Sequence, residues 1–231
     1  MSVLLHLETT TLQCSVALSN NRKLLASRTI RNEGYSHAEM LLTFIDEVLI
    51  EGGVSRSELS AVSISSGPGS YTGLRIGAAT AKGICHALDI PLISVDTLTV
   101  LAIQARINHP GKDAYVSMLD ARRMEVYTRT FDENLDATTD IEAMVIPEFN
   151  KFPWDEYVNI CFSGDGALKC RDILKGENRE FIEDWPTADA AINLATDKFE
   201  EKKFEGLASY EPTYLKKFVA GKSKDPLGLR K

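Results

Sequence analysis

The stretch SSGPGSYTGLRIG, residues 65–77, decides the fold, because it sets four glycines and a proline between an apolar run and an alanine-rich run. The run before it, LSAVSISS (59–66), is short and apolar and predicts a buried strand. The run that follows, GLRIGAATAKGICHAL (73–88), predicts a helix that is rich in small residues. A strand, a glycine-rich turn and a helix in this order indicate an α/β unit.

The glycines of this turn suit two different functions. Backbone N–H groups at a helix N-terminus bind phosphate when glycines let the chain approach the anion. The same glycines also permit a tight turn with positive φ. No Gly-Lys-Ser/Thr sequence is present, so the motif alone favours a structural turn and leaves a ligand as the alternative. The candidate nucleotide or anion contacts in this stretch are Gly67, Gly69 and Gly73.

The residues around this unit extend the α/β pattern. Short β-rich runs beside an Asn-Asn turn predict an antiparallel meander, and a capped apolar run that ends at two glycines predicts a helix. An aspartate after the next strand caps a third helix. The expected elements are strands at 3–8, 14–19 and 23–30, a helix at 36–51 capped by Ser36, the strand at 59–66, the helix at 73–88, a strand at 91–95, and a helix from Asp96 through Arg106.

The second half of the chain repeats this order loosely. Strands are expected at 114–120, at 125–132, near 141–146 and at 158–164, and helices at 166–174 and 188–202. Two similar halves predict a duplicated α/β lobe. The boundary is placed near 104–112, at an Asn-His-Pro-Gly break. This gives an N-terminal lobe of residues 1–105 and a C-terminal lobe of residues 106–231 that ends in a basic tail.

Charge is distributed unevenly along the chain. The protein carries −7 in total, which argues against nucleic-acid binding by its body, because neutralising phosphates needs clustered Lys and Arg. From Lys216 to Lys231 there are six basic residues and one acidic residue, or +5, which leaves −12 on the rest. The composition of this tail is typical of disorder. Its charge also suits a contact with nucleic acid.

The cysteines, apolar runs and histidines argue against a secreted protein, a membrane protein and a metal-binding protein. Four cysteines without a C-x-x-C pair, and no signal segment, indicate reduced thiols in a cytoplasmic protein. No apolar run reaches the roughly 18 to 20 residues of a membrane span, so no membrane association is expected. The four histidines are never closer than 23 residues. Two ligands on one helix are about one turn apart, so no metal site is expected.

Several stretches resemble the signature of the TsaB (YeaZ-type) proteins. They are SSGPGSYTGLRIGAATAKGICHALDIPLISVDTL at 65–98, LETTTLQCSVAL at 7–18, SHAEMLL at 36–42, LDARRMEVY at 119–127 and SGDGA at 163–167. The similarity spans essentially the whole chain. Its most specific part is GPGSYTGLRIG, within the glycine-rich turn and the helix after it.

The resemblance implies a fold and a set of partners. The fold is the actin-like ATPase (ASKHA) fold, an α/β fold of two related βββαβα lobes, which agrees with the pattern above. The function implied is that of a non-catalytic partner of a larger, related transferase, TsaD, together with the ATPase TsaE. This complex places threonylcarbamoyl on the adenosine beside the anticodon of tRNAs that read codons beginning with A. The expected partners are a TsaD-type transferase, a TsaE-type ATPase, tRNA through the complex, and a second copy in a homodimer.

The phosphate loops of this fold are altered here. Actin-like ATPases hold phosphates on two glycine-containing hairpin loops, but here the first reads Glu8-Thr9-Thr10-Thr11 and the second Asp120-Ala121-Arg122-Arg123-Met124. The two arginines can still attract an anion. Only Gly164 and Gly166 resemble the adenosine-side loop, and they join the candidate nucleotide contacts. We expect no ATP hydrolysis by this chain and no cofactor bound to it alone, whereas the partner complex uses ATP.

Two other functions compete with this interpretation. A small-molecule kinase or ATPase of the same fold needs an Asp base and open phosphate loops, which are missing, and it stays as the alternative. A peptidase needs a histidine pair or a serine elbow. Ser70 lies in a glycine-rich turn, but Pro68 and Thr72 stand where the elbow has glycines. The peptidase is therefore rejected.

The partner interface is predicted on the helices at 36–51 and 73–88. Apolar residues of the first helix fill an arc of about 200°, whereas a helix that covers only its own core needs about 100°. The alternative explanation is a helix buried deeply in the monomer. Small residues of the second helix allow another helix to approach closely, and resemblance implies that TsaB proteins associate through these two helices. The predicted interface residues are Met40, Leu41, Leu42, Phe44, Ile45, Leu49, Arg75, Ala79 and Gly83.

Overall fold

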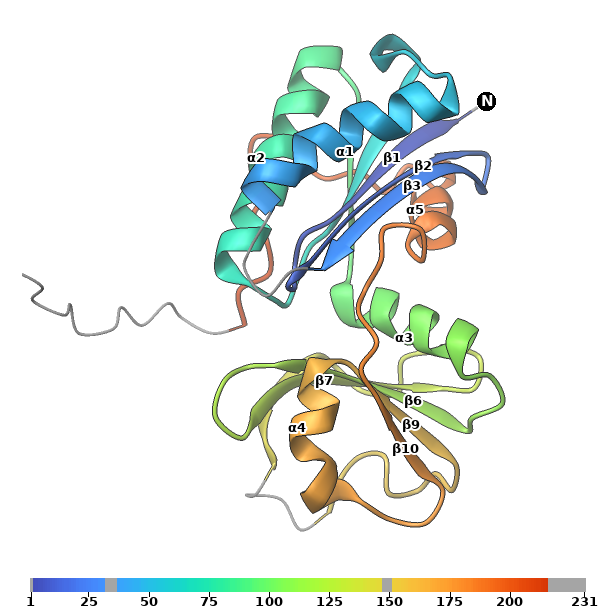
Figure 1. Ribbon diagram of the computed structural model, residues 1–231, viewed down its shortest axis with the longest axis vertical. Coiled ribbons are helices and arrows are strands. Elements are labelled where there is room, and N and C mark those ends of the chain that lie inside the picture. The colour runs from blue at the N-terminus through green and yellow to red at the C-terminus, as the bar shows by residue number, and fades with distance from the viewer. Residues whose placement is uncertain (1, 32–36, 147–150, 216–231) are drawn as a thin grey trace, which may run out of the picture.

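The computed structural model describes residues 2–31, 37–146 and 151–215 of the 231 residues in the chain. The chain forms two lobes that follow one another along its long axis, and each lobe is built on a five-stranded mixed sheet (Figure 1). The strand orders are β3-β2-β1-β4-β5 in the first sheet and β10-β9-β6-β7-β8 in the second. The predicted α/β fold of two related lobes is confirmed.

The first sheet has a completely buried strand at its centre. β1 lies between β2 and β4 and is buried at every residue, and its near-continuous apolar run VLLHLE is typical of such a strand. The strands predicted in this half are confirmed, with ends that differ by one or two residues. The antiparallel meander comprises β1 (Val3–Glu8), β2 (Gln13–Asn20) and β3 (Lys23–Arg31), and the parallel strands are β4 (Ala61–Ser65) and β5 (Leu92–Val95).

Two helices, α1 (His37–Gly52) and α2 (Tyr71–Leu88), lie side by side on one face of the first sheet (Figure 1). The hydroxyl oxygen of Ser70 caps α2 by accepting from the Gly73 N–H at 3.3 Å. α2 therefore starts two residues before the predicted position, because its cap lies inside the glycine-rich turn. The cap predicted for α1, Ser36, lies outside the described residues.

The second lobe repeats the meander and adds an edge strand that the sequence did not predict. β10 (Arg179–Ile182) pairs with β9, and all four of its residues are half-buried. Two charged residues in four give no apolar pattern, so this strand has no sequence signal. The predicted elements that are confirmed are β6 (Ala114–Asp120), β7 (Glu125–Asp132), β8 (Glu142–Val145), β9 (Ile160–Ser163) and α4 (Asp165–Leu174).

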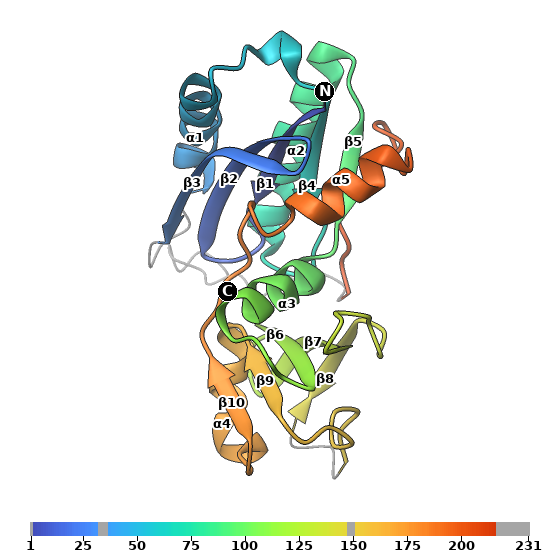
Figure 2. The same ribbon diagram turned by 90° about the vertical axis from the view of Figure 1, so that its right-hand side faces the viewer.

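Two further helices complete the fold. α3 (Thr97–Asn108), capped by Asp96 as predicted, lies between the sheets: Val100 joins the core of the first, and Ala102 joins that of the second. α5 (Ile192–Glu200) packs against β5 of the first sheet (Figure 2). The lobe division at residue 105 stays a prediction, but this part of the predicted C-terminal lobe lies on the N-terminal sheet. A short 3-10 turn, η1 (Arg56–Glu58), precedes β4.

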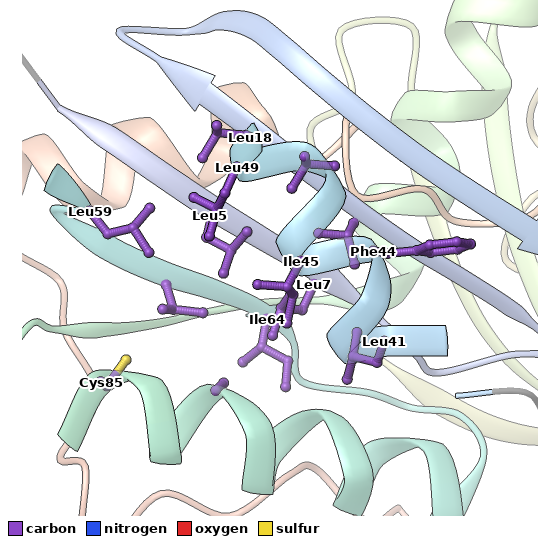
Figure 3. Packing of buried hydrophobic residues seen from close by; sticks show 14 of the residues in the cluster. Leu5, Leu7, Leu18, Leu41, Phe44, Ile45, Leu49, Leu59, Ile64 and Cys85 are labelled. Atoms are coloured by element: carbon purple, nitrogen blue, oxygen red, sulfur yellow. The ribbon is translucent and has the colours of Figure 1, made fainter. Parts of the chain in front are cut away.

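The wide apolar face of α1 is covered by the protein itself. Leu41, Phe44, Ile45 and Leu49 are between 1% and 6% exposed and pack in the core of the first lobe, where Leu5 of β1 also lies (Figure 3). Their arc of about 200° is filled because α1 contacts both the sheet beneath it and α2 beside it. The structure therefore corrects the predicted interface at these four positions, which belong to the core.

Candidate functional site

The first hairpin loop, Glu8–Thr11, folds around its own carboxylate. The backbone N–H and the hydroxyl of Thr10 both donate to Oε1 of Glu8, at 2.6 and 2.5 Å. The Thr9 hydroxyl donates to the carbonyl oxygen of Gly73 at 2.8 Å. All four residues of the loop are buried. The N–H group of Thr10 is thus bound within the protein and is not presented to a phosphate.

The glycine-rich turn packs directly on this loop. A Cβ at Gly69 would lie closer than 3.0 Å to the Thr10 carbonyl oxygen, and one at Gly77 would lie equally close to the Thr9 hydroxyl. The Ser70 N–H donates to the same Thr10 carbonyl at 2.6 Å. Because a side chain larger than hydrogen does not fit, these glycines allow the turn to touch the loop.

In the second lobe, Gly164 and Gly166 also allow two backbone segments to approach closely. Gly164 has a φ of +110°, and a Cβ there would lie closer than 3.0 Å to the carbonyl oxygen of Met118. A Cβ at Gly166 would approach the backbone of β6 to 2.9 Å. Oδ1 of Asp165 accepts from the Asp120 N–H at 2.8 Å. The start of α4 therefore lies directly against β6.

A cavity of about 750 Å³ lies between the two loops and the glycine-rich turn. Of the five candidate nucleotide contacts only Gly69 lines it, whereas the other four lie outside its lining. Gly67, for example, donates its N–H to the Thr97 hydroxyl at 3.1 Å. The residues that line the cavity include Thr10 and Thr11, residues 68–72, and Asp120, Arg122 and Arg123.

Residues 204–215, here called the C-terminal strap, cross the first lobe and end at this cavity. The Glu205 N–H donates to the Leu92 carbonyl of β5 at 2.9 Å, and the Thr213 N–H donates to the Ser66 carbonyl at 2.8 Å. The last three residues of the strap line the cavity. No periodic pattern marks this segment, so the sequence does not predict it.

The small residues of α2 lie in two stripes that face opposite directions. Gly77 and Ala81 are buried, whereas Ala79 and Gly83 are exposed, and a Cβ at Gly83 would meet no atom within 4 Å. On the neighbouring α1, Leu42 is 61% exposed. The predicted interface residues that remain accessible are the half-buried Met40 and the exposed Leu42, Arg75, Ala79 and Gly83.

Burial shifts the pKa values of two β1 side chains in opposite directions. Desolvation raises the pKa of Glu8 to about 6, although hydrogen bonds from Ser65 and Thr10 favour its ionised form. His6, on the same face of the strand, is also fully buried, and desolvation lowers its pKa to about 3. A ring nitrogen of His6 hydrogen-bonds the Ser19 hydroxyl at 2.8 Å. Neither side chain lines the cavity.

Glu8 and His6 should have opposite effects on how the free energy of unfolding varies with pH. The raised pKa of Glu8 makes the folded state bind a proton that the unfolded state has lost, so stability falls as pH rises from about 4.5 to 6. The lowered pKa of His6 has the opposite effect over the same window. In the variant Glu8→Gln only the His6 effect remains, so we expect the free energy of unfolding to rise with pH. Its change across the window should differ from that of the wild type by about 2 kcal/mol.

In the matched variant His6→Gln only the Glu8 effect remains, so the free energy of unfolding should fall as pH rises. Both effects are measured as the free energy of unfolding in urea at several pH values between about 4.5 and 6. Parallel curves for the wild type and both variants would contradict the opposed pKa shifts of Glu8 and His6.

The part of the chain that the structure describes offers neither a metal-binding cluster nor a membrane-spanning helix. No cluster of three or more His, Cys, Asp or Glu side chains there could hold a metal ion. None of the helices described is long and apolar enough to cross a membrane. The four cysteines are buried free thiols.

Two lobes of this topology with a cavity between them define the actin-like ATPase fold. The activator of 2-hydroxyisocaproyl-CoA dehydratase from Clostridium difficile, solved with bound ADPNP, has a TM-score of 0.50. It is 12% identical, over 87% of this chain and 96% of that chain, and shows the fold alone.

Nearer relatives show the family. YeaZ from Pseudomonas aeruginosa has a TM-score of 0.82 and 28% identity, over 93% of this chain and 100% of that chain. The Escherichia coli K12 "tRNA threonylcarbamoyladenosine biosynthesis protein TsaB" is 30% identical over 230 residues, 95% of this chain and 96% of its own. The Haemophilus influenzae protein of that name is 37% identical over 129 residues, 54% of this chain and 51% of its own. Residues 32–221 match the family model "TsaD: tRNA N6-adenosine threonylcarbamoyltransferase". The chain belongs to the TsaB (YeaZ-type) family.

Proposed function

We propose that this protein is the non-catalytic partner of a TsaD-type transferase that forms threonylcarbamoyladenosine beside the anticodon of tRNA. The observation that carries the proposal is the relation to Escherichia coli TsaB, which extends over 95% of this chain. A TsaE-type ATPase completes the complex, the complex uses ATP, and tRNA binds through it. The assembly works in the cytoplasm.

The two altered loops support a role without catalysis. The residue at the start of the first loop, Glu8, is buried and does not line the cavity, and the Thr10 N–H is bound to it. Asp120 of the second loop lines the cavity, but Lys169 binds its carboxylate. A kinase or ATPase needs open loops and a free carboxylate base, so this alternative is not favoured. Residues 32–221 also match a transferase model, so an assay of the chain alone is needed to distinguish a partner from a catalyst.

The accessible face of α1 and α2 supports docking of the transferase. Leu42 presents an exposed apolar side chain, and the absence of a side chain at Gly83 allows the backbone of another helix to come close. Arg75 and Ala79 lie on the same exposed side of α2. A second copy of this chain would use the same face in a homodimer, in competition with the transferase.

Reconstitution tests the proposed function. The transferase, the ATPase, tRNA, ATP and a threonylcarbamoyl donor should yield modified tRNA only when this chain is added. The chain alone should release no phosphate from ATP, because its first loop presents no free N–H group at Thr10. A stoichiometric burst of phosphate from the chain alone, abolished by Glu8→Ala, would show that it is itself a catalyst.

A further inference from the structure

Arg75 of α2 is held by an aromatic ring and not by a carboxylate. Its guanidinium carbon lies 4.4 Å from the ring centroid of Tyr71, one turn earlier on the same helix. Arg75 is exposed and forms no ion pair with any residue that the structure describes. Six other arginines bind carboxylates of this chain: Arg22, Arg28, Arg31, Arg56, Arg129 and Arg179. Since attraction to the face of a ring does not require a hydrogen bond, the N–H donors of Arg75 are available to another molecule.

The C-terminal strap places a second ring against Tyr71. The ring centroids of Tyr71 and Tyr214 are 5.2 Å apart, and the rings are inclined at 45°. The residue before Tyr214 is fixed to the end of β4, because the Thr213 N–H donates to the Ser66 carbonyl at 2.8 Å. Tyr71 therefore contacts Arg75 on its own helix and Tyr214 on the strap. The position of the Arg75 guanidinium thus depends on the strap.

The strap follows the side of α2 that carries Arg75. Lys82 lies on this side too, because residues seven apart in a helix are two turns apart. Its Nζ donates to the carbonyl oxygens of Ala208 and Tyr210 of the strap, at 3.2 Å each. Tyr210 is 7% exposed and packs in the core of the first lobe, which anchors the strap. The strap therefore forms a border along α2.

Arg75 also lies beside the proposed docking face. Ala79 follows it by one turn and Gly83 by two turns, and both are exposed. Leu42 of the neighbouring α1 is 61% exposed. These three positions offer no hydrogen-bonding side chain, whereas a guanidinium offers five N–H donors in a fixed plane. A charge beside such a contact selects a partner of opposite charge and fixes its orientation.

We infer that Arg75 binds a carboxylate of the transferase, and that the rings of Tyr71 and Tyr214 position its guanidinium for this contact. The inference rests on the proposed function and adds the chemistry of the partner group and a role for the strap. A guanidinium can bind a carboxylate through two parallel N–H bonds. An arginine that is held in place before binding loses less conformational entropy when the complex forms.

Titration calorimetry of the full-length chain with the transferase tests the ion pair. Arg75→Gln should weaken binding about 30-fold, because the carboxylate of the transferase would lose its cation. This loss should be smaller at 1 M than at 0.1 M ionic strength, since the Debye length falls from about 10 to about 3 Å. Arg75→Lys should recover only part of the affinity, because lysine keeps the charge but not the planar donors.

The matched control is Arg171→Gln. Arg171 is an exposed arginine of α4, in the second lobe, and it too forms no ion pair with the residues that the structure describes. Its replacement removes the same charge at a distance from the docking face, so affinity for the transferase should equal that of the wild type. Thermal unfolding verifies that every variant is folded.

A double-mutant cycle separates positioning from direct contact. Tyr214→Ala should weaken binding about fivefold, because the side chain of Arg75 must then be ordered during binding. In the Arg75→Gln background the same change should have no further effect, since no guanidinium is left to position. Tyr214→Phe keeps the ring and should bind as the wild type does. A fivefold loss in both backgrounds would show that Tyr214 touches the transferase itself, and would contradict its positioning role.

Wild-type affinity in Arg75→Gln, or an equal loss in Arg171→Gln, would overturn the inference and leave the proposed function standing, as long as the wild-type chain binds the transferase. A wild-type chain that never binds it would contradict the proposed function and the inference together. Weaker binding of tRNA by the assembled complex of Arg75→Gln, with unchanged affinity between the two subunits, would assign Arg75 to an RNA phosphate instead.

Discussion

Replacing Gly164 by alanine is expected to destabilise the protein by about 3 to 5 kcal/mol. Gly164 has φ 110° and ψ 172°, a region of backbone conformation that is essentially restricted to glycine. A Cβ would also collide with the carbonyl oxygen of Met118. That carbonyl belongs to β6, the central strand of the second sheet, which hydrogen bonds to β7 and β9 hold in place. The free energy of unfolding in urea measures the effect.

Gly111 provides the matched control for this variant. It also has a positive φ, +80°, but a Cβ there would meet no atom within 4 Å. Gly111→Ala should therefore cost only the backbone strain, about 1 to 2 kcal/mol. The difference between the two variants reports the contact between the start of α4 and β6 together with the greater backbone strain at position 164. Equal losses at positions 164 and 111 would show that β6 moves aside, and would contradict the close packing.

The variants Leu42→Glu and Gly83→Trp are expected to weaken binding of the transferase about 100-fold each, without unfolding the chain. Leu42 is 61% exposed and Gly83 has open space around it, so both substitutions fit the monomer. In a complex, the glutamate would bury an unpaired charge, which costs about 3 kcal/mol or more. The tryptophan would keep a helix of the transferase from approaching α2. Titration calorimetry with the transferase measures both effects.

The control for these two variants is Ile50→Glu. Ile50 is 80% exposed on α1, about two turns from Leu42, and lies outside the proposed face. Its replacement should leave affinity for the transferase unchanged. Sedimentation of each variant alone shows whether a homodimer uses the same face, in which case self-association is lost as well. Wild-type affinity in Leu42→Glu and Gly83→Trp would place the interface elsewhere.

The structure explains why the predicted interface included residues that belong to the core. A helical wheel shows how wide an apolar face is, but not how many neighbours cover it. Leu41 and Ile45 are buried because α1 packs on the sheet and beside α2, and both neighbours are distant in sequence. The accessibility of Leu42 and Gly83 could be established only once these neighbours were in place. Their role in docking stays a prediction.

The sequence by itself determined the family and most of the elements, although not β10. Some features depend only on residues close together in the chain, so they can be recognised without the fold. They include caps such as Asp96, the alternating strands and helices, and the GPGSYTGLRIG motif. The absence of glycine from both hairpin loops could be recognised for the same reason.

Only the tertiary structure decided what the glycines contact and where the C-terminal strap lies. Gly69 meets Thr10, and Gly164 meets Met118, through approaches between segments that no local pattern relates. The same holds for α5, which returns to the first sheet, and for the strap, which brings Tyr214 to Tyr71. Such contacts depend on the packing of whole layers, because burial and steric fit are properties of the assembled chain and not of any one segment.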